Sequence, residues 1–212
     1  MNSAVKPYPT LTASIIYLIL FFAVFTWSII DAKDYPTWTL EVTPAIIGII
    51  ILILSRKKFP LTVLCYSLIL LHCWILMIGG HYTYAEVPLF DNIKDLFDQS
   101  RNNYDKVGHF AQGFVPAIIC REIIIRLKII NSRFFTHFFT LFFCLGFSAF
   151  YELIEWWVAL LSDEAAEAFL GTQGYIWDTQ SDMSWALIGA ICAIIFLSPV
   201  HDKQINKLQT LS

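Results

Sequence analysis

Apolar and polar positions follow one another in long blocks, with six apolar runs separated by short polar connections. A helix needs roughly 20 apolar residues to cross the hydrocarbon core of a bilayer. The six runs cover residues 11–30, 38–54, 61–78, 107–125, 134–161 and 183–200. An open β-sheet cannot span lipid, because the N–H and C=O groups at its edges would have no partners. We therefore predict an all-α fold, a polytopic membrane helical bundle of about six transmembrane helices, in a single integral membrane domain over residues 1–212.

The composition supports this prediction. Of the 212 residues, 57% are hydrophobic and 15% are charged, whereas soluble domains contain about a quarter charged residues. An ordinary soluble globular protein is thereby excluded. The formal net charge of -3, with basic residues in small groups, lacks the concentrated cationic surface that nucleic acid requires. The expected partner is the lipid bilayer, not nucleic acid.

The basic residues predict the orientation, because short cytoplasmic loops retain Lys and Arg. They gather in the tails and in the second and fourth connections, at Lys6, Arg56, Lys57, Lys58, Arg126, Lys128, Arg133, Lys203 and Lys207. The fifth connection, residues 162–182, has five acids and no Lys or Arg, as suits the outer side. The third connection is discordant, since it carries Lys94, Arg101 and Lys106. Six spans with both tails basic favour cytoplasmic N- and C-termini.

The third connection has an amphipathic pattern of its own. Leu89, Ile93, Leu96 and Phe97 recur at helical spacing between charged residues, which predicts a short amphipathic helix at the outer interface. Two interpretations are open: a loop helix that covers the bundle, or a lid over a site.

Ionisable groups inside spans are costly in lipid and mark functional positions. Here the ionisable groups belong to three helical stripes of polar and small residues, and all three stripes enter from the predicted outer side. The stripes comprise Asp105, His109, Gln112 and Pro116 on the fourth run; Cys144, Ser148, Glu152, Glu155 and Ala159 on the fifth; and Asp178, Asp182, Trp185 and Gly189 on the sixth. The predicted topology brings all three stripes to one leaflet, where we expect them to face a common cavity.

Carboxylates this close cannot all stay ionised without compensation by a cation or shared protons. Six residues are candidate ligands for a divalent metal ion such as Mg, Mn or Zn: Asp105, His109, Glu152, Glu155, Asp178 and Asp182. The alternative is metal-free general acid–base catalysis. Under either chemistry His109, Glu152 and Glu155 are the candidate catalytic residues, and the sequence leaves both chemistries open.

Each of these residues also has a simpler interpretation. Asp105 and Asp178 are of a type that caps helix N-termini, and His109 or the glutamates could be structural. At the predicted inner end, Glu122 and Arg126 are spaced as an i, i+4 pair beside Arg121, and we interpret them as an interfacial ion pair without chemistry. All five cysteines fall in predicted spans, so we expect no disulfide and no thiolate zinc site.

Several motifs resemble the YjdF-type family of bacterial inner-membrane proteins. They are Gly79-Gly80-His81-Tyr82-Thr83-Tyr84, Tyr104-Asp105-Lys106-Val107-Gly108-His109-Phe110, Tyr151-Glu152-Leu153-Ile154-Glu155-Trp156, and Trp177-Asp178 followed by Asp182-Met183. The resemblance runs from about Gly79 onward and implies a multi-pass protein of the bacterial inner membrane, in a family without an established activity. His81 and Tyr151 of these motifs, with Asp105 and Gln112, are candidates for binding or orienting a substrate. More loosely, the Asp-x-x-x-His and Asp-x-x-x-Asp pairs resemble the VanZ-like family, although Glu155 stands where that family usually has Gln.

Three functional hypotheses follow. The leading one is a membrane-embedded hydrolase or transferase acting on a lipid or lipid-linked substrate from the outer leaflet. The second is a carrier or sensor that binds a small cation, protons or a solute, and the third is a structural envelope protein. A carrier needs polar groups that continue to the inner side, whereas the stripes give way to Pro116 and Cys144. This pattern favours a one-sided site.

Overall fold

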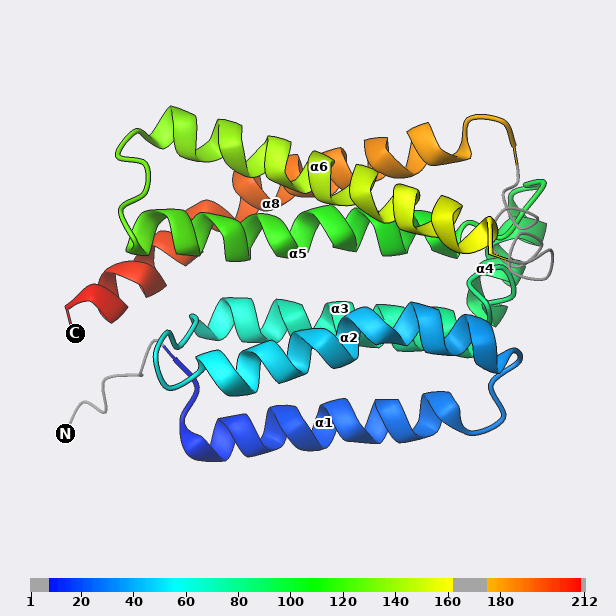
Figure 1. The fold of residues 1–212 in the computed structure, drawn as a ribbon, viewed down its shortest axis with the longest axis horizontal. Helices are drawn as coiled ribbons and strands as arrows, with labels where there is room; N and C mark the ends of the chain where they lie inside the picture. Colours follow the sequence, from blue (N-terminus) through cyan, green and yellow to red (C-terminus); the bar gives the residue numbers. More distant parts are fainter. Residues whose placement is uncertain (1–7, 162–174, 211–212) are drawn as a thin grey trace.

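The computed structural model describes residues 8–161 and 175–210, and the regular structure within these ranges is entirely helical. The helices pack side by side in an elongated bundle, with the short α4 across one end (Figure 1). They are α1 (Leu11–Ile29), α2 (Tyr35–Ser55), α3 (Val63–His81), α4 (Pro88–Leu96), α5 (Tyr104–Arg126), α6 (Arg133–Ala159) and α8 (Asp178–Gln209). Three of the acids predicted to mark the outer side lie at positions 163–167, outside the described residues. The predicted helical membrane bundle is confirmed.

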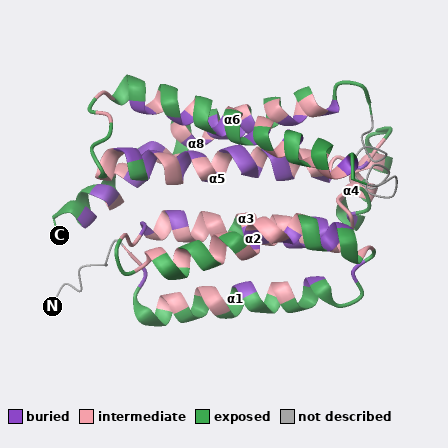
Figure 2. Cartoon of the chain, in the orientation of Figure 1, coloured by how far each residue is buried: buried purple, intermediate pink, exposed green. Residues whose placement is uncertain are grey.

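Each predicted apolar run overlaps one of the six long helices. Five of these, α1, α2, α3, α6 and α8, are long and apolar enough to cross a membrane. The exception is α5, whose sequence contains several polar and charged residues. It is nevertheless the central helix, with buried positions along its whole length (Figure 2). A span count of six therefore stays a prediction.

Local sequence determines where several helices begin. Thr10, Asp34, Thr62 and Ser132 precede α1, α2, α3 and α6, and each side chain accepts a hydrogen bond from the backbone N–H three residues later. Such caps satisfy N–H groups that have no partner inside the helix. Asp105 and Asp178 do not act this way, because the N-cap residues of α5 and α8 are Asn103 and Trp177. The two acids lie inside the first helical turn and are free to make tertiary contacts.

The predicted amphipathic helix in the third connection is α4. It has no buried residue, and Leu89 and Leu96 are 64% and 77% exposed. Its apolar face is therefore open to the surroundings, as expected of a helix at a membrane interface.

The bundle has two halves with separate cores. One core joins α1, α2 and α3 around Val42 and Met77. The other joins the start of α3 to α5, α6 and α8 around Cys65, Ile118 and Cys144. The helix α3 thus belongs to both cores and connects the halves.

Helices α5 and α8 approach each other more closely than side chains would allow. A Cβ on Gly113 would lie 1.7 Å from the carbonyl oxygen of Ala186, and one on Gly189 would lie 2.1 Å from that of Phe110. Only glycine fits at these two crossings. The close approach brings the first turns of α5 and α8, with their acids, next to each other.

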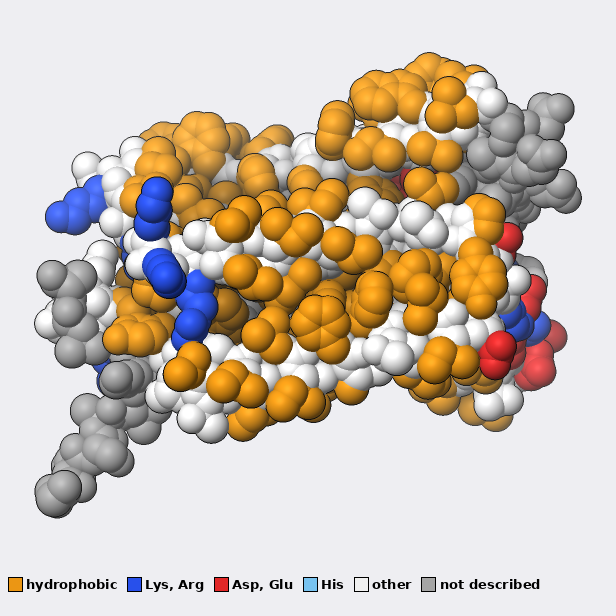
Figure 3. Space-filling view, turned by 60° about the horizontal axis from the view of Figure 1, so that its bottom comes forward, with side chains coloured by type: hydrophobic (Ala, Val, Ile, Leu, Met, Phe, Trp, Pro, Cys, Tyr) orange, Lys and Arg blue, Asp and Glu red, His pale blue; other side chains and the backbone are white. Residues whose placement is uncertain are grey.

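Charge is segregated along the bundle. The start of α1 and the end of α8 lie at the same end of the bundle (Figure 1). Lys and Arg side chains gather there, while Asp and Glu side chains gather mainly at the opposite end (Figure 3). We call these the basic end, where α2 and α5 finish and α6 begins, and the acidic end, where α4 lies.

Candidate functional site

The site at the acidic end is built around His109 on α5. The His109 Nε2 atom lies 3.2 Å from Asp105 Oδ1, one turn earlier on the same helix. The side chain of His109 is 8% exposed and that of Asp105 is 25% exposed. The i, i+4 spacing in the sequence therefore becomes a direct contact between imidazole and carboxylate.

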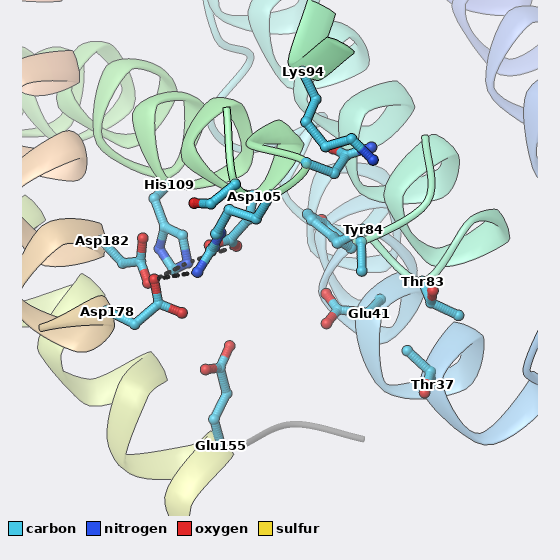
Figure 4. A pocket seen from close by; sticks show the side chains of 14 residues that line it. Thr37, Glu41, Thr83, Tyr84, Lys94, Asp105, His109, Glu155, Asp178 and Asp182 are labelled. Atoms are coloured by element: carbon cyan, nitrogen blue, oxygen red, sulfur yellow. Dashed lines mark hydrogen bonds and ion pairs between the residues drawn. The ribbon is translucent and has the colours of Figure 1, made fainter. Parts of the chain in front are cut away.

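Two other helices bring carboxylates to the same imidazole. Glu152 Oε1 of α6 and Asp182 Oδ2 of α8 each lie 3.8 Å from His109 Nε2. Asp178, one turn before Asp182, faces the same space, and Glu155 points into it from α6 (Figure 4). The three stripes thus meet at one place, as their spacing predicts, while the roles of their residues stay predictions.

Gln112 determines which nitrogen of His109 faces the acids. Its side-chain oxygen lies 3.1 Å from His109 Nδ1, and an amide oxygen only accepts, so Nδ1 carries the donated proton. Nε2 then faces the carboxylates, to which it donates when it carries a proton, or it offers its lone pair to a cation bound between them. Metal-binding histidines show this arrangement, in which the second ring N–H is held by an oxygen.

The carboxylates are not fully satisfied by protein donors. Glu152 Oε1 and Asp182 Oδ1 are buried without a hydrogen-bond partner among the described residues. Two triads bring possible metal ligands together, Asp105–His109–Asp182 and His109–Glu152–Glu155. Within each triad the ligand atoms lie within 4.8 Å of one another. Buried carboxylate oxygens without donors are costly unless a cation or a proton compensates them. These residues therefore suit a divalent cation bound by oxygen and nitrogen ligands.

Arg101, just before α5, is a site residue that the sequence prediction missed. It donates to Asp178 at 2.7 Å and to Asp105 at 3.3 Å. Burial opposes the charge of Arg101, but the hydrogen bond and charge of Asp178 outweigh it and raise the pKa of the guanidinium. The charge of Arg101 is thus neutralised by carboxylates within the site, which explains one basic residue of the discordant third connection.

Glu41 on α2 and Tyr84 in the turn after α3 were also missed, and both line the site opposite Asp105 (Figure 4). Glu41 did carry a signal, as a carboxylate inside an apolar run. Tyr84 and its neighbour Thr83 adopt positive φ angles of 58° and 57°, a conformation that costs non-glycine residues about 1–3 kcal/mol. Burial, followed by the charge of Glu41, raises the pKa of Tyr84 well above its usual range, so its hydroxyl stays neutral.

Two glycines accommodate the Tyr84 ring. A Cβ on Gly79 would lie 2.2 Å from this ring, and one on Gly108 would lie 2.9 Å from it. The ring therefore packs between α3 and α5 only because both positions lack a side chain. This gives Gly79 and Gly108 of the two motifs a physical reason, since they leave room for Tyr84 beside the acids.

The predicted orienting residues divide into two groups. Gln112 and Tyr151 line a cavity next to the site. His81 does not, because its Nδ1 lies 3.0 Å from the carbonyl oxygen of Ser28 and its ring packs against Trp27 with the centroids 4.5 Å apart. The structure thus places His81 in the contact between α3 and α1, away from the acids.

Two adjoining cavities open at the acidic cluster. The first, of about 290 Å³, is lined mainly by polar residues of α2, α5, α6, α8 and the connections. The second, of about 640 Å³, is a largely apolar groove between the two halves of the bundle. A polar group and an apolar group of one molecule could therefore lie side by side here.

The opposite, basic end holds a different buried cluster, in which the predicted pair of Glu122 and Arg126 forms at 2.7 Å together with further partners. Glu122 is 0% exposed and accepts hydrogen bonds from Thr62, Cys65, His201 and Arg126. We call these five residues the Glu122 cluster. A pair read from α5 alone could not reveal the partners on α3 and α8.

The Glu122 cluster differs from the acidic site in how its histidine is held. Arg121 donates to Nδ1 of His201 at 3.1 Å, so the proton of the neutral ring is on Nε2, which donates to Glu122 at 3.0 Å. The Cys65, Glu122 and His201 ligand atoms are also close together, but Nε2 offers no lone pair and Arg126 already compensates the carboxylate. This cluster is a satisfied network that joins α3, α5 and α8.

Comparison with known proteins places the chain in a family. A family model described as "Predicted membrane protein (DUF2238)" matches residues 13–203. The chain belongs to the DUF2238 family. A separate comparison with curated proteins matches the inner membrane protein YjdF of Escherichia coli (strain K12). The two sequences are 49% identical over 178 residues, which cover 84% of this chain and 85% of that protein. No solved structure matches the chain significantly.

Membership of the DUF2238 family confirms the resemblance to YjdF-type proteins. It also confirms the predicted location, since the chain is a multi-pass helical protein of the bacterial inner membrane. The family description names no activity, so function has to be argued from the site.

Proposed function

We propose that this DUF2238 protein is a membrane-embedded hydrolase or transferase that acts on a lipid or lipid-linked substrate at the acidic end. One observation carries the proposal: the His109–carboxylate cluster lies where a polar cavity meets an apolar groove. An amphiphile placed there would have its polar group against the carboxylates and its apolar part in the groove. A water-soluble substrate would use only the polar cavity.

A divalent cation held by His109 Nε2 and the surrounding carboxylates is part of this proposal. The two buried carboxylate oxygens without donors, on Glu152 and Asp182, support it, as does the orientation of His109 by Gln112. Such an ion would polarise an ester oxygen of the substrate. The metal-free alternative assigns compensation to protons on the acids and predicts no cation dependence.

The chain's own residues would handle the protons. Glu155 lines both cavities and would accept a proton from water as the water oxygen bonds to the ester centre. The ester bond then breaks, and Glu155 would pass this proton to the departing oxygen, while Glu152 would help to hold the cation. In a transferase, an alcohol takes the place of water. Arg101 would position Asp178 and Asp105 through its ion pairs with both.

We also propose six membrane spans with cytoplasmic termini, which puts the acidic site in the outer leaflet. The gathering of Lys and Arg at the end where α1 starts and α8 ends supports this orientation. The burial of α5 inside the bundle supports counting it as a span, because its polar side chains then avoid lipid.

The carrier hypothesis needs a polar path between the two ends. On α5, residues 113–120 between Gln112 and Arg121 contain no charged side chain, and the groove beside them is largely apolar. This arrangement favours chemistry at one end over transport. A purely structural role would not account for the buried carboxylate oxygens without donors, which are costly to bury.

The test is lipid turnover by the purified protein. Wild-type protein, Glu155→Gln and the control Glu86→Gln would be reconstituted in vesicles of total bacterial lipid with Mg²⁺, Mn²⁺ or Zn²⁺, and lipids followed by mass spectrometry. Glu86 makes an exposed pair with Lys33, so its variant should behave as wild type. We expect a lipid species to be consumed by wild type and control but not by Glu155→Gln. A Glu155→Gln protein that matches wild type in lipid turnover would refute the catalytic role.

A further inference from the structure

The apolar groove between the two halves extends far from the acidic site. On α2 its lining begins at Glu41 and reaches Ser55, and on α5 it begins at Asp105 and reaches Ile123. At roughly 1.5 Å per residue these stretches are about 21 Å and 27 Å long. The hydrocarbon core of a bilayer is about 30 Å thick. The groove therefore follows most of the depth of the membrane.

The groove is continuous with the acidic site. Five residues line both the polar cavity and the groove: Glu41, Tyr84, Asp105, His109 and Glu155. Beyond them the lining is mainly aliphatic and aromatic, with Ile51, Ile119 and Phe147 among its members. A molecule in the groove would thus present one end to the carboxylates.

The width of the groove limits what it can hold. A volume of about 640 Å³ spread over 21–27 Å corresponds to a mean diameter of roughly 6 Å for the space open to atom centres, or roughly 9 Å between the walls. An α-helix with its side chains is about 10 Å across, so a transmembrane helix of a partner does not fit. One extended hydrocarbon chain does, because carbon atoms in contact are about 4 Å apart.

We propose that the groove binds an extended hydrocarbon chain of the lipid substrate, whose polar group lies at the acidic end. As a statement about substrate, this inference rests on the proposed function. The chain lies along the membrane normal between α2 and α5, and Ser55, Phe59 and Ile123 mark the far end of the groove. The substrate class is thereby a lipid with a long linear chain.

A substitution at Gly48 would fill part of the groove without changing the acidic residues. Gly48 lines the groove on α2, and a Cβ built there meets nothing within 4 Å. A Gly48→Phe side chain would therefore enter open space. Gly146 on α6 is the matched control, because its Cβ also meets nothing within 4 Å and it is not part of the groove lining.

The experiment uses the full-length protein in nanodiscs of phosphatidylethanolamine and phosphatidylglycerol, with a phosphatidylethanolamine probe that carries a photoreactive diazirine in one chain. Cross-links are mapped by mass spectrometry after illumination. We expect enriched labelling of Ile51 and Ile119 over the lipid-facing Phe139. Gly48→Phe should lower the labelling of Ile51 and Ile119 about tenfold, which is the effect of displacing two buried methylenes. Gly146→Phe should leave this labelling unchanged.

Labelling of Ile51 and Ile119 no denser than that of Phe139, or unchanged in Gly48→Phe, would overturn the inference and indicate ordinary surrounding lipid. The Glu155→Gln variant separates the two proposals. Lipid turnover that depends on Glu155 without groove labelling refutes the chain site alone. Groove labelling that persists in Glu155→Gln, with equal turnover in that variant and wild type, refutes the proposed catalysis and leaves the chain site intact.

Discussion

Replacing Glu122 by Gln should destabilise the protein, although the two side chains have the same shape. The carboxylate accepts hydrogen bonds from the backbone N–H and hydroxyl of Thr62, the Cys65 thiol, the His201 ring and Arg126. An amide keeps one accepting oxygen and adds two N–H donors. Wherever the amide nitrogen is placed, it faces groups that also donate.

The cost can be worked out for the two amide orientations. If nitrogen replaces Oε1, Arg126 loses its 2.7 Å partner; if it replaces Oε2, His201 and Cys65 lose theirs at 3.0 Å and 3.1 Å. Each hydrogen bond to a charged group is worth about 1.5–3 kcal/mol, and breaking a buried ion pair costs about 3–5 kcal/mol. We expect a loss of about 3–5 kcal/mol, which lowers the melting temperature on the order of 10 °C.

The assay is thermal unfolding of the purified variants in one detergent, followed by intrinsic tryptophan fluorescence. Glu86→Gln is the control, since the Lys33–Glu86 pair is exposed and such pairs contribute about 0–1 kcal/mol. The buried Glu152→Gln provides the contrast, because its Oε1 has no donor among the described residues and neutralisation relieves repulsion from Asp105 and Asp178. Equal melting temperatures for Glu122→Gln and Glu86→Gln would refute this description of the Glu122 cluster.

Three further predictions concern packing, charge and topology. Gly113→Val should destabilise by about 3 kcal/mol or more, because its Cβ overlaps the Ala186 carbonyl, whereas Gly146→Val should leave the melting curve unchanged. Arg101→Gln should lower stability by about 2 kcal/mol in the same assay, because Asp178, only 5% exposed, loses its charged partner; a loss no larger than for Glu86→Gln would contradict this. Reporter fusions should place residue 212 in the cytoplasm and residues 162–174 outside, and the reverse result would invalidate the outer-leaflet site.

Helical periodicity was enough to predict the convergence at the acidic end. Asp105 and His109 share a helix face, and the topology fixes which ends of α5, α6 and α8 meet, so their contact follows from spacing and orientation. The Glu122 cluster could not be predicted in this way. Its partners Thr62 and His201 are 60 and 79 residues from Glu122, and no periodic pattern relates them.

Single polar residues in apolar surroundings were harder to interpret. Glu41 appeared only as an irregularity in a run, yet α2 turns it toward Asp105 and His109. His81 shared a motif with site residues, but the turn that follows it directs Tyr84, not His81, into the site. The helix α8 also continues past the predicted apolar run 183–200 to Gln209, with His201 and Ile205 buried.

The central claim, a cation held by His109 and the carboxylates, is tested most directly by titrating the chelator-treated protein with Mn²⁺ in an isothermal calorimeter. Wild type and Glu86→Gln should bind one ion per chain. Gln112→Ala, which frees the His109 ring, should bind about 10–100-fold more weakly, and His109→Ala should bind weaker still. Identical titration curves for wild type and His109→Ala, or no binding to wild type, would contradict the account.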